Sequence, residues 1–235
     1  MVRKQPPKLS PDNGVGLRGH RPSRPFFISD LSYLQDNVRI MPKILPQKFF
    51  DQPTLAAAKS LLGKYLVRRY RGNPSPDKAT KGKDIALMIT EVEAYDGPHD
   101  TASHASRGET PRTKIMFGEA GRFYVYFTYG MHWMLNVVTG AKGYPAAILL
   151  RGGMVKMRHG TWKEVRGPAR LTKYLKIDKK LDGNLADRRT GLWFEDRGKI
   201  IKPSRIVRGK RIGVKYAGKI WANKLYNFQI KKETR

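Results

Sequence analysis

Residues 84–105, DIALMITEVEAYDGPHDTASHA, decide the fold of this chain, because an apolar run leads directly into carboxylates, a ring and two histidines. The apolar part predicts a buried strand over 84–95. Side chains two apart in a strand point to the same face, so Glu91, Glu93 and Tyr95 are expected side by side at its carboxyl end. The polar segment that follows, 96–114, is too long for a simple turn. Ordered loops of that length are usually functional, so an acid and a ring are predicted beside a functional loop.

Towards the N-terminus, residues 51–63 predict a helix that opens the ordered domain, with Asp51 as its cap and Gly63 as its end. The expected buried face of this helix carries Leu55, Ala58, Leu61 and Leu62. Residues 65–70, YLVRRY, then predict a strand that is joined to 84–95 by a long exposed hairpin loop at 71–83.

Towards the C-terminus, residues 121–140, GRFYVYFTYGMHWMLNVVTG, are aromatic and β-branched on both sides of Tyr129–Gly130. This pattern predicts a hairpin whose turn lies at that dipeptide. Periodicity alone favours a core position for Phe123 and Tyr124. A large ring beside a turn glycine tends to be exposed, however, so Tyr129 is suited to stacking on a base or wedging between bases.

Three further elements follow the hairpin. Residues 143–153, GYPAAILLRGG, predict a buried strand that ends at Arg151, a cation at a strand terminus where catalytic residues often lie. A short helix is expected to begin at Gly167–Pro168. The pattern of RIGVKYAGKIW, residues 211–221, predicts another strand.

Composition limits the class of protein. The chain has 235 residues, 47 Lys plus Arg against 19 Asp plus Glu, a formal net charge of +28 and no cysteine. This charge favours a polyanionic partner, with nucleic acid first, while the lack of cysteine excludes disulfides and zinc–cysteine sites. No apolar run approaches the roughly 18 residues that span a bilayer, so a membrane protein is not expected.

The domain organisation follows from the same composition. Residues 1–44 are rich in proline and basic residues and predict a disordered arm, which either binds nucleic acid or serves as an address signal. Residues 45–235 are expected to form one domain. An intracellular protein of the nucleus or nucleoid is expected, with organellar targeting by the arm as an alternative.

Two other functions remain open on the residues alone. His99, Asp100 and His104 are potential metal ligands, which would suit a metal-dependent nuclease, although no further acid or histidine stands at a ligand-like spacing. Glu93 is also compatible with a surface ion pair, although its place after an apolar strand and beside Tyr95 argues against one. The lysine-rich segments are compatible with a non-catalytic basic module that binds nucleic acid.

Six segments, in this order, resemble the alkyladenine (3-methyladenine) DNA glycosylase family: FFDQPTLAAAKSLLGKYLVRR, ITEVEAYDGPHDTASHASRGETPRTKIMF, GRFYVYFTYGMHWMLNVV, AAILLRGG, RGPARL and RIGVKYAG. The resemblance implies an α+β fold, a single domain with a curved antiparallel sheet, flanking helices and a protruding β-hairpin. It implies a monofunctional enzyme, without metal or other cofactor, that flips alkylated or deaminated purines out of duplex DNA. Its partner would be double-stranded DNA containing damaged purines such as 3-methyladenine, hypoxanthine or ethenoadenine, and a monomer is expected.

The resemblance also implies roles in hydrolysis of the N-glycosidic bond. Glu93 matches the family's general base, which activates the attacking water, and Arg151 matches the residue that helps to hold that water and the glutamate. Tyr95, His104 and Tyr126 match residues that enclose the flipped base, where aromatic faces favour cationic, alkylated purines.

Further matches concern selectivity and DNA binding. Asn136 matches a pocket residue that crowds the exocyclic amino group of guanine, and Ile212 a position whose backbone carbonyl contacts the water. Tyr129 matches the side chain that fills the gap left by the flipped nucleotide, and Met131 and Arg112 are expected to contact DNA with it. The chain departs from the family at His132, in the loop 71–83, in the segment 153–166 and in the C-terminal KLYNFQI.

Overall fold

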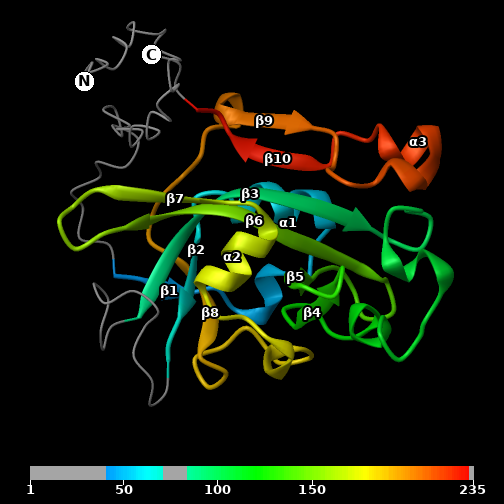
Figure 1. Cartoon of the computed structure of the whole chain (residues 1–235), viewed down its shortest axis with the longest axis horizontal. Helices are drawn as coiled ribbons and strands as arrows, with labels where there is room; N and C mark the ends of the chain where they lie inside the picture. Colours follow the sequence, from blue (N-terminus) through cyan, green and yellow to red (C-terminus); the bar gives the residue numbers. More distant parts are fainter. Residues whose placement is uncertain (1–40, 71–83, 233–235) are drawn as a thin grey trace, which may run out of the picture.

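A curved antiparallel sheet forms the frame of the protein in the computed structural model, which describes residues 41–70 and 84–232 (Figure 1). The strands follow the order β1-β8-β2-β3-β6-β5-β4, β7 pairs with β6, and the β9–β10 hairpin adds to β3. The strands are β1 Lys43–Ile44, β2 Tyr65–Arg68, β3 Ile85–Asp96, β4 Phe123–Thr128, β5 His132–Val138, β6 Ala146–Lys156, β7 Trp162–Arg166, β8 Leu192–Asp196, β9 Ile206–Gly209 and β10 Asn227–Ile230. Thus β1 begins two residues before the predicted domain start at residue 45. The rest of the predicted arm, residues 1–40, and the predicted loop 71–83 lie outside the described residues.

The helices α1 (Thr54–Leu61) and α2 (Pro168–Tyr174) cover the inner face of the sheet and share its main hydrophobic core. The helices are α1 Thr54–Leu61, α2 Pro168–Tyr174 and α3 Gly218–Ala222, and the short 3-10 turns are η2 Gln47–Phe49, η4 His104–Arg107, η5 Lys114–Phe117, η6 Lys179–Leu181, η7 Pro203–Arg205 and η8 Lys215–Ala217. The predicted start of α2 at Gly167–Pro168 is confirmed. With this core the α+β single-domain prediction is confirmed as well.

The α1 helix confirms one predicted boundary and corrects the other. Its first turn is bonded to the carbonyl of Pro53, and Asp51 lies two residues before this N-cap, too far along the chain to cap the helix. The predicted cap was therefore wrong. Gly63 ends the helix with a φ of +81°, and a Cβ there would lie 2.8 Å from Cγ1 of Ile201.

A bulge in the middle of β3 decides which side chains face the core. Before it, Ile85, Leu87 and Ile89 point into the inner core, and after it Val92 and Ala94 do. The alternation of two is thus shifted by one residue between Ile89 and Val92, as β-bulges do. This shift turns Glu91, Glu93 and Tyr95 away from the core and onto the outer face of the sheet.

The β6 strand runs past the predicted end at Arg151 to Lys156. Gly153 allows close packing in this extension, because a Cβ there would lie 2.0 Å from Cδ2 of Leu87. Arg151 is the extra residue on β6 where its register with β3 shifts, between Gly152 and Leu150. The guanidinium therefore leaves the sheet in mid-strand, beside the carboxylates.

The predicted hairpin is confirmed, whereas the predicted strand at 211–221 is wrong. The β4–β5 turn has positive φ at Tyr129 (51°) and Gly130 (63°), and the N–H of Met131 donates to the carbonyl of Thr128 at 3.1 Å, as in a type I′ turn. Residues 211–221 instead form a loop, η8 and α3, because Gly213 and Gly218 take left-handed conformations that break an extended chain. The strand at this end is β10, which runs along β3 (Figure 1).

Candidate active site

The carboxylate of Glu93 is fully buried and accepts hydrogen bonds from four groups, each from a different segment of the chain. Oε1 accepts from the backbone N–H of Ile212 at 2.7 Å and from Nδ2 of Asn227 at 3.2 Å. Oε2 accepts from the hydroxyl of Tyr95 at 3.1 Å and from Nη1 of Arg151 at 3.4 Å. Such a set of donors fixes the orientation of the carboxylate.

Arg151 is shared between two carboxylates. Its Nε donates to Oε1 of Glu91 at 3.0 Å and lies 3.4 Å from Oε1 of Glu93. All three side chains are at least nine-tenths buried, so one cation compensates two anions away from bulk water. Glu93 is therefore not the exposed ion-pair partner that remained possible from the sequence.

A second buried ion pair holds the loop that supplies the Ile212 N–H. Arg211 forms a two-pronged ion pair with Asp100, and its guanidinium lies over the ring of Tyr95 at 4.8 Å from the centroid. Both charged side chains are fully buried. Asp100 also accepts from the backbone N–H groups of Asp96 and Ala102 at 3.1 Å. The pair thus ties the segment after β3 to the segment after β9.

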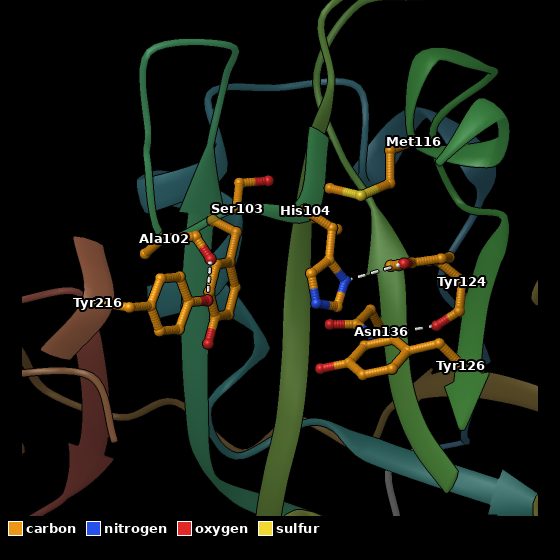
Figure 2. Close-up of a pocket in the computed structure, with 10 residues that line it drawn as sticks. Ala102, Ser103, His104, Met116, Tyr124, Tyr126, Asn136 and Tyr216 are labelled. Atoms are coloured by element: carbon orange, nitrogen blue, oxygen red, sulfur yellow. Dashed lines mark hydrogen bonds between the residues drawn. The ribbon is translucent and has the colours of Figure 1, made fainter. Parts of the chain in front are cut away.

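An aromatic pocket that is open to solvent lies on the outer face of the sheet (Figure 2). The pocket is lined by Tyr95, Ala102, Ser103, His104, Met116, Tyr124, Tyr126, Asn136, Ala147 and Tyr216. Alternation along β4 and β5 places Tyr124, Tyr126 and Asn136 here, and β3 adds Tyr95, whose hydroxyl reaches Glu93.

His104 is a neutral ring in this pocket. Its Nδ1 lies 3.0 Å from the hydroxyl of Tyr124, and its ring meets that of Tyr126 edge-on, with centroids 4.6 Å apart. Burial, with a smaller effect of Arg112, lowers the pKa of His104 from 6.5 to about 4. Burial likewise raises the pKa of Tyr126 and of Tyr95, so these hydroxyls stay protonated.

Asn136 lines the pocket and is also held by the backbone. Its Nδ2 donates to the carbonyl of Tyr124 at 3.0 Å, and the residue is 4% exposed. Figure 2 shows it between His104 and Tyr126. Asn136 therefore both lines the pocket and bonds to neighbouring backbone.

The tip of the β4–β5 hairpin exposes two large side chains. Tyr129 is 81% exposed and Met131 67% exposed. A tyrosine with positive φ is uncommon and costs backbone energy, so the turn holds this ring outward at a cost. Arg112 is also exposed, and its guanidinium lies over the ring of Tyr126, 5.0 Å from the centroid. Arg112 therefore lies beside a ring that lines the pocket.

The arrangement does not favour the three-residue metal site that was open from the sequence. Asp100 directs both oxygens to Arg211 and to main-chain amides, while His99 is exposed and His104 bonds Tyr124. Within residues 41–70 and 84–232, no three His, Cys, Asp or Glu side chains form a group that could hold a metal ion. Among the helices in the same ranges, none is long and apolar enough to cross a membrane.

Three residues of this site were not predicted as site residues. Arg211 lay in a segment expected to be a strand, and Asn227 in an ending with no recognisable pattern. Tyr216 lines the pocket and donates from its hydroxyl to the carbonyl of Ala102 at 2.9 Å. Tyr216 and Arg211 both lie in RIGVKYAG, a segment that resembles the family. That resemblance was the signal that could have identified them as site residues.

Known proteins are similar to this chain over most of its length. The chain is 41% identical over 186 residues to a protein of Methanocella arvoryzae, covering 74% of this chain and 86% of the relative. It is 40% identical over 188 residues to a protein of Legionella pneumophila strain Corby, covering 80% and 94%. It is 40% identical over 183 residues to one of Streptomyces avermitilis, covering 72% and 81%. Each of these relatives is described as "Putative 3-methyladenine DNA glycosylase".

The class defined by these findings is that of the DNA glycosylases, which are hydrolases of DNA repair. The model of the methylpurine-DNA glycosylase (MPG) family matches residues 48–234. The chain belongs to the methylpurine-DNA glycosylase family. The resemblance that the sequence motifs indicated is thereby confirmed, and damaged DNA is the substrate that membership implies.

Proposed function

We propose that this protein flips alkylated or deaminated purine nucleotides, of the 3-methyladenine, hypoxanthine and ethenoadenine type, into the aromatic pocket. Glu93 then acts as the general base on a water that hydrolyses the N-glycosidic bond. The observation that carries the proposal is a fully buried carboxylate one hydrogen bond from a ring that lines the pocket. A general base must lie within hydrogen-bond reach of the proton that it removes.

The pocket suits an electron-poor purine. Tyr95 and Tyr126 offer aromatic faces, which attract a cationic base. His104 stays neutral at pH 7, because its pKa is about 4, and therefore does not repel a positively charged alkylated purine. The second ring nitrogen of His104 faces the open middle of the pocket (Figure 2), where it can bond a base edge.

The exposed hairpin tip and the basic surface suit the flipping step. The ring of Tyr129 can occupy the space that the flipped nucleotide leaves in the stack, with Met131 beside it. Arg112 and the net charge of +28 attract the phosphates without reading the sequence. Arg151 holds the general base Glu93 in place. The carbonyl of Ile212 is proposed to contact the attacking water.

A duplex with one hypoxanthine or one ethenoadenine, incubated with the protein in EDTA, tests the proposal. Release of free base and formation of an alkali-sensitive site are expected, without trapping by borohydride, since no amine nucleophile is involved. Binding without base release would identify a non-catalytic module, and chelator-sensitive cutting of the backbone would identify a nuclease.

Glu93→Gln tests the general base directly. The amide is nearly isosteric but cannot accept the proton of the water, so duplex binding should persist while the single-turnover rate falls by about 10²-fold or more. Glu119→Gln is the matched control, because Glu119 is exposed and pairs with Arg122. Appreciable activity of Glu93→Gln would move the role elsewhere, and Glu91 would be examined next.

A further inference from the structure

The C-terminal strand β10 places two amides opposite the two buried carboxylates of β3. In the antiparallel register, Asn227 pairs with Glu93 and Gln229 pairs with Glu91. Directly opposed residues in a sheet contact one another, so this register forces amide–carboxylate contacts. Both amides lie in residues 224–230, where the chain departs from the family pattern.

Asn227 donates to both carboxylates at once. Its Nδ2 lies 3.0 Å from Oε1 of Glu91 and 3.2 Å from Oε1 of Glu93, and the residue is 1% exposed. The two hydrogens of one amide nitrogen therefore join two oxygens that would otherwise only repel each other. Each donated bond fixes the position of the carboxylate oxygen that accepts it.

Gln229 fixes the orientation of that amide. Its Nε2 donates to Oδ1 of Asn227 at 2.9 Å and lies 3.4 Å from Oε1 of Glu91. Because Oδ1 of Asn227 is engaged with a donor, Nδ2 is left facing the carboxylates. A reversed amide would set its oxygen against two anions and its nitrogen against the amide of Gln229.

Charge explains the need for a neutral donor at this place. Glu93 is faced by Glu91 and Tyr95 on its own strand, by Arg151 on β6, by Tyr126 on β4 and by Arg211 before Ile212. Arg211 is engaged by Asp100, so Arg151 is the one cation among the described residues that bonds both glutamates. An amide adds two donors without bringing another ion into a buried site, where each ion costs desolvation energy.

We infer that Asn227, oriented by Gln229, is a positioning residue for the reaction, which holds the Glu93 carboxylate in place while Glu91 holds Arg151. The inference rests on the proposed role of Glu93 as general base. The C-terminal β9–β10 hairpin thereby completes the active site.

The test compares pH profiles of the single-turnover rate on a hypoxanthine duplex for the wild type, Asn227→Asp and Asn184→Asp. Asp keeps the shape of Asn227 but adds a third carboxylate between two others. The acid limb should therefore move to higher pH by about one unit, and the rate at pH 7 should fall about tenfold or more. Asn184 is exposed and bonds only a backbone carbonyl of η6, so the same change there should leave the profile unchanged.

Gln229→Leu provides a second test in case Asn227→Asp does not fold. It leaves all charges in place and frees Asn227 to turn, so we expect a loss of about fivefold in rate with the duplex still bound. The inference is overturned if the Asn227→Asp profile superimposes on that of the wild type, or, should that variant not fold, if Gln229→Leu keeps the full rate. Failure of the wild type to release any base overturns the proposed function itself, and the inference with it.

Discussion

Asp100→Asn should destabilise the fold far more than the same change at Asp84, although both acids form two-pronged pairs with an arginine. Asp84 pairs with Arg69 at 2.7 and 2.9 Å, where the two side chains are 33% and 44% exposed. Asp100 pairs with Arg211, and both of these side chains are 0% exposed. The two variants therefore compare one interaction at two levels of burial.

The expected magnitude follows from what remains around Arg211. Removal of one partner from a buried pair leaves an uncompensated charge and costs about 3–5 kcal/mol, whereas an exposed pair contributes about 0–1 kcal/mol. The carbonyls of Ala94 and Trp221 still accept from Arg211, which reduces the loss. The nitrogen of the new amide, however, is itself a donor and must face N–H groups that bond an oxygen of Asp100 in the wild type. We expect about 3–4 kcal/mol for Asp100→Asn and under about 1 kcal/mol for Asp84→Asn.

Urea unfolding, followed by fluorescence and far-UV circular dichroism, measures this difference. The free energy of unfolding is obtained for the wild type and both variants, and coincident transitions from the two probes establish that two states suffice. Losses that agree within about 1 kcal/mol would refute the argument from burial. In Asp100→Asn the rate of base release should also fall, because Arg211 holds Tyr95 and the chain at Ile212.

Three further predictions concern the pocket and the hairpin. Tyr129→Ser should slow excision of a stably paired lesion more than of a mismatched one, by stacking worth about 1–3 kcal/mol, and equal single-turnover losses on both would contradict a wedge. Asn136→Ser should raise excision of mispaired guanine while changing hypoxanthine excision less, and a parallel fall in both rates would show that its bond to Tyr124 matters more. The unfolded state binds the proton of His104 below pH 6.5 and the folded state only below about pH 4, so His104 lowers stability as pH falls through this window. His104→Phe should flatten the fall of unfolding free energy between pH 6.5 and 4, which urea titrations at several pH values would detect.

Local signals predicted much of the fold. The Tyr129–Gly130 turn, the start of α2 at Gly167–Pro168 and the end of α1 at Gly63 all depend on conformations that one or two residues impose on the backbone. The site motif was predicted with equal ease, because Glu93 and Tyr95 lie two apart on one strand. Such features involve neighbours in sequence, so a pattern of a few residues is enough to specify them.

Glycines lie in both segments where the predicted strands differ from the structure. The strand predicted to end at Arg151 continues to Lys156, and Gly153 allows it to pack tightly beside Leu87. Gly213 and Gly218, by contrast, interrupt a segment expected to be a strand. A glycine permits either outcome, and the surrounding packing selects one.

By itself the sequence determined that Glu91, Glu93 and Tyr95 share one face of a strand, but not which face. Without the bulge between Ile89 and Val92, a strict alternation would have turned them into the hydrophobic core. The donors around Glu93 also come from far along the chain, since Asn227 is 134 residues away. Alternation along a strand shows which side chains share a face, but not which face is buried in the core. A buried charge is stable only where distant strands bring its partners. Tertiary structure therefore decided both the face and the site.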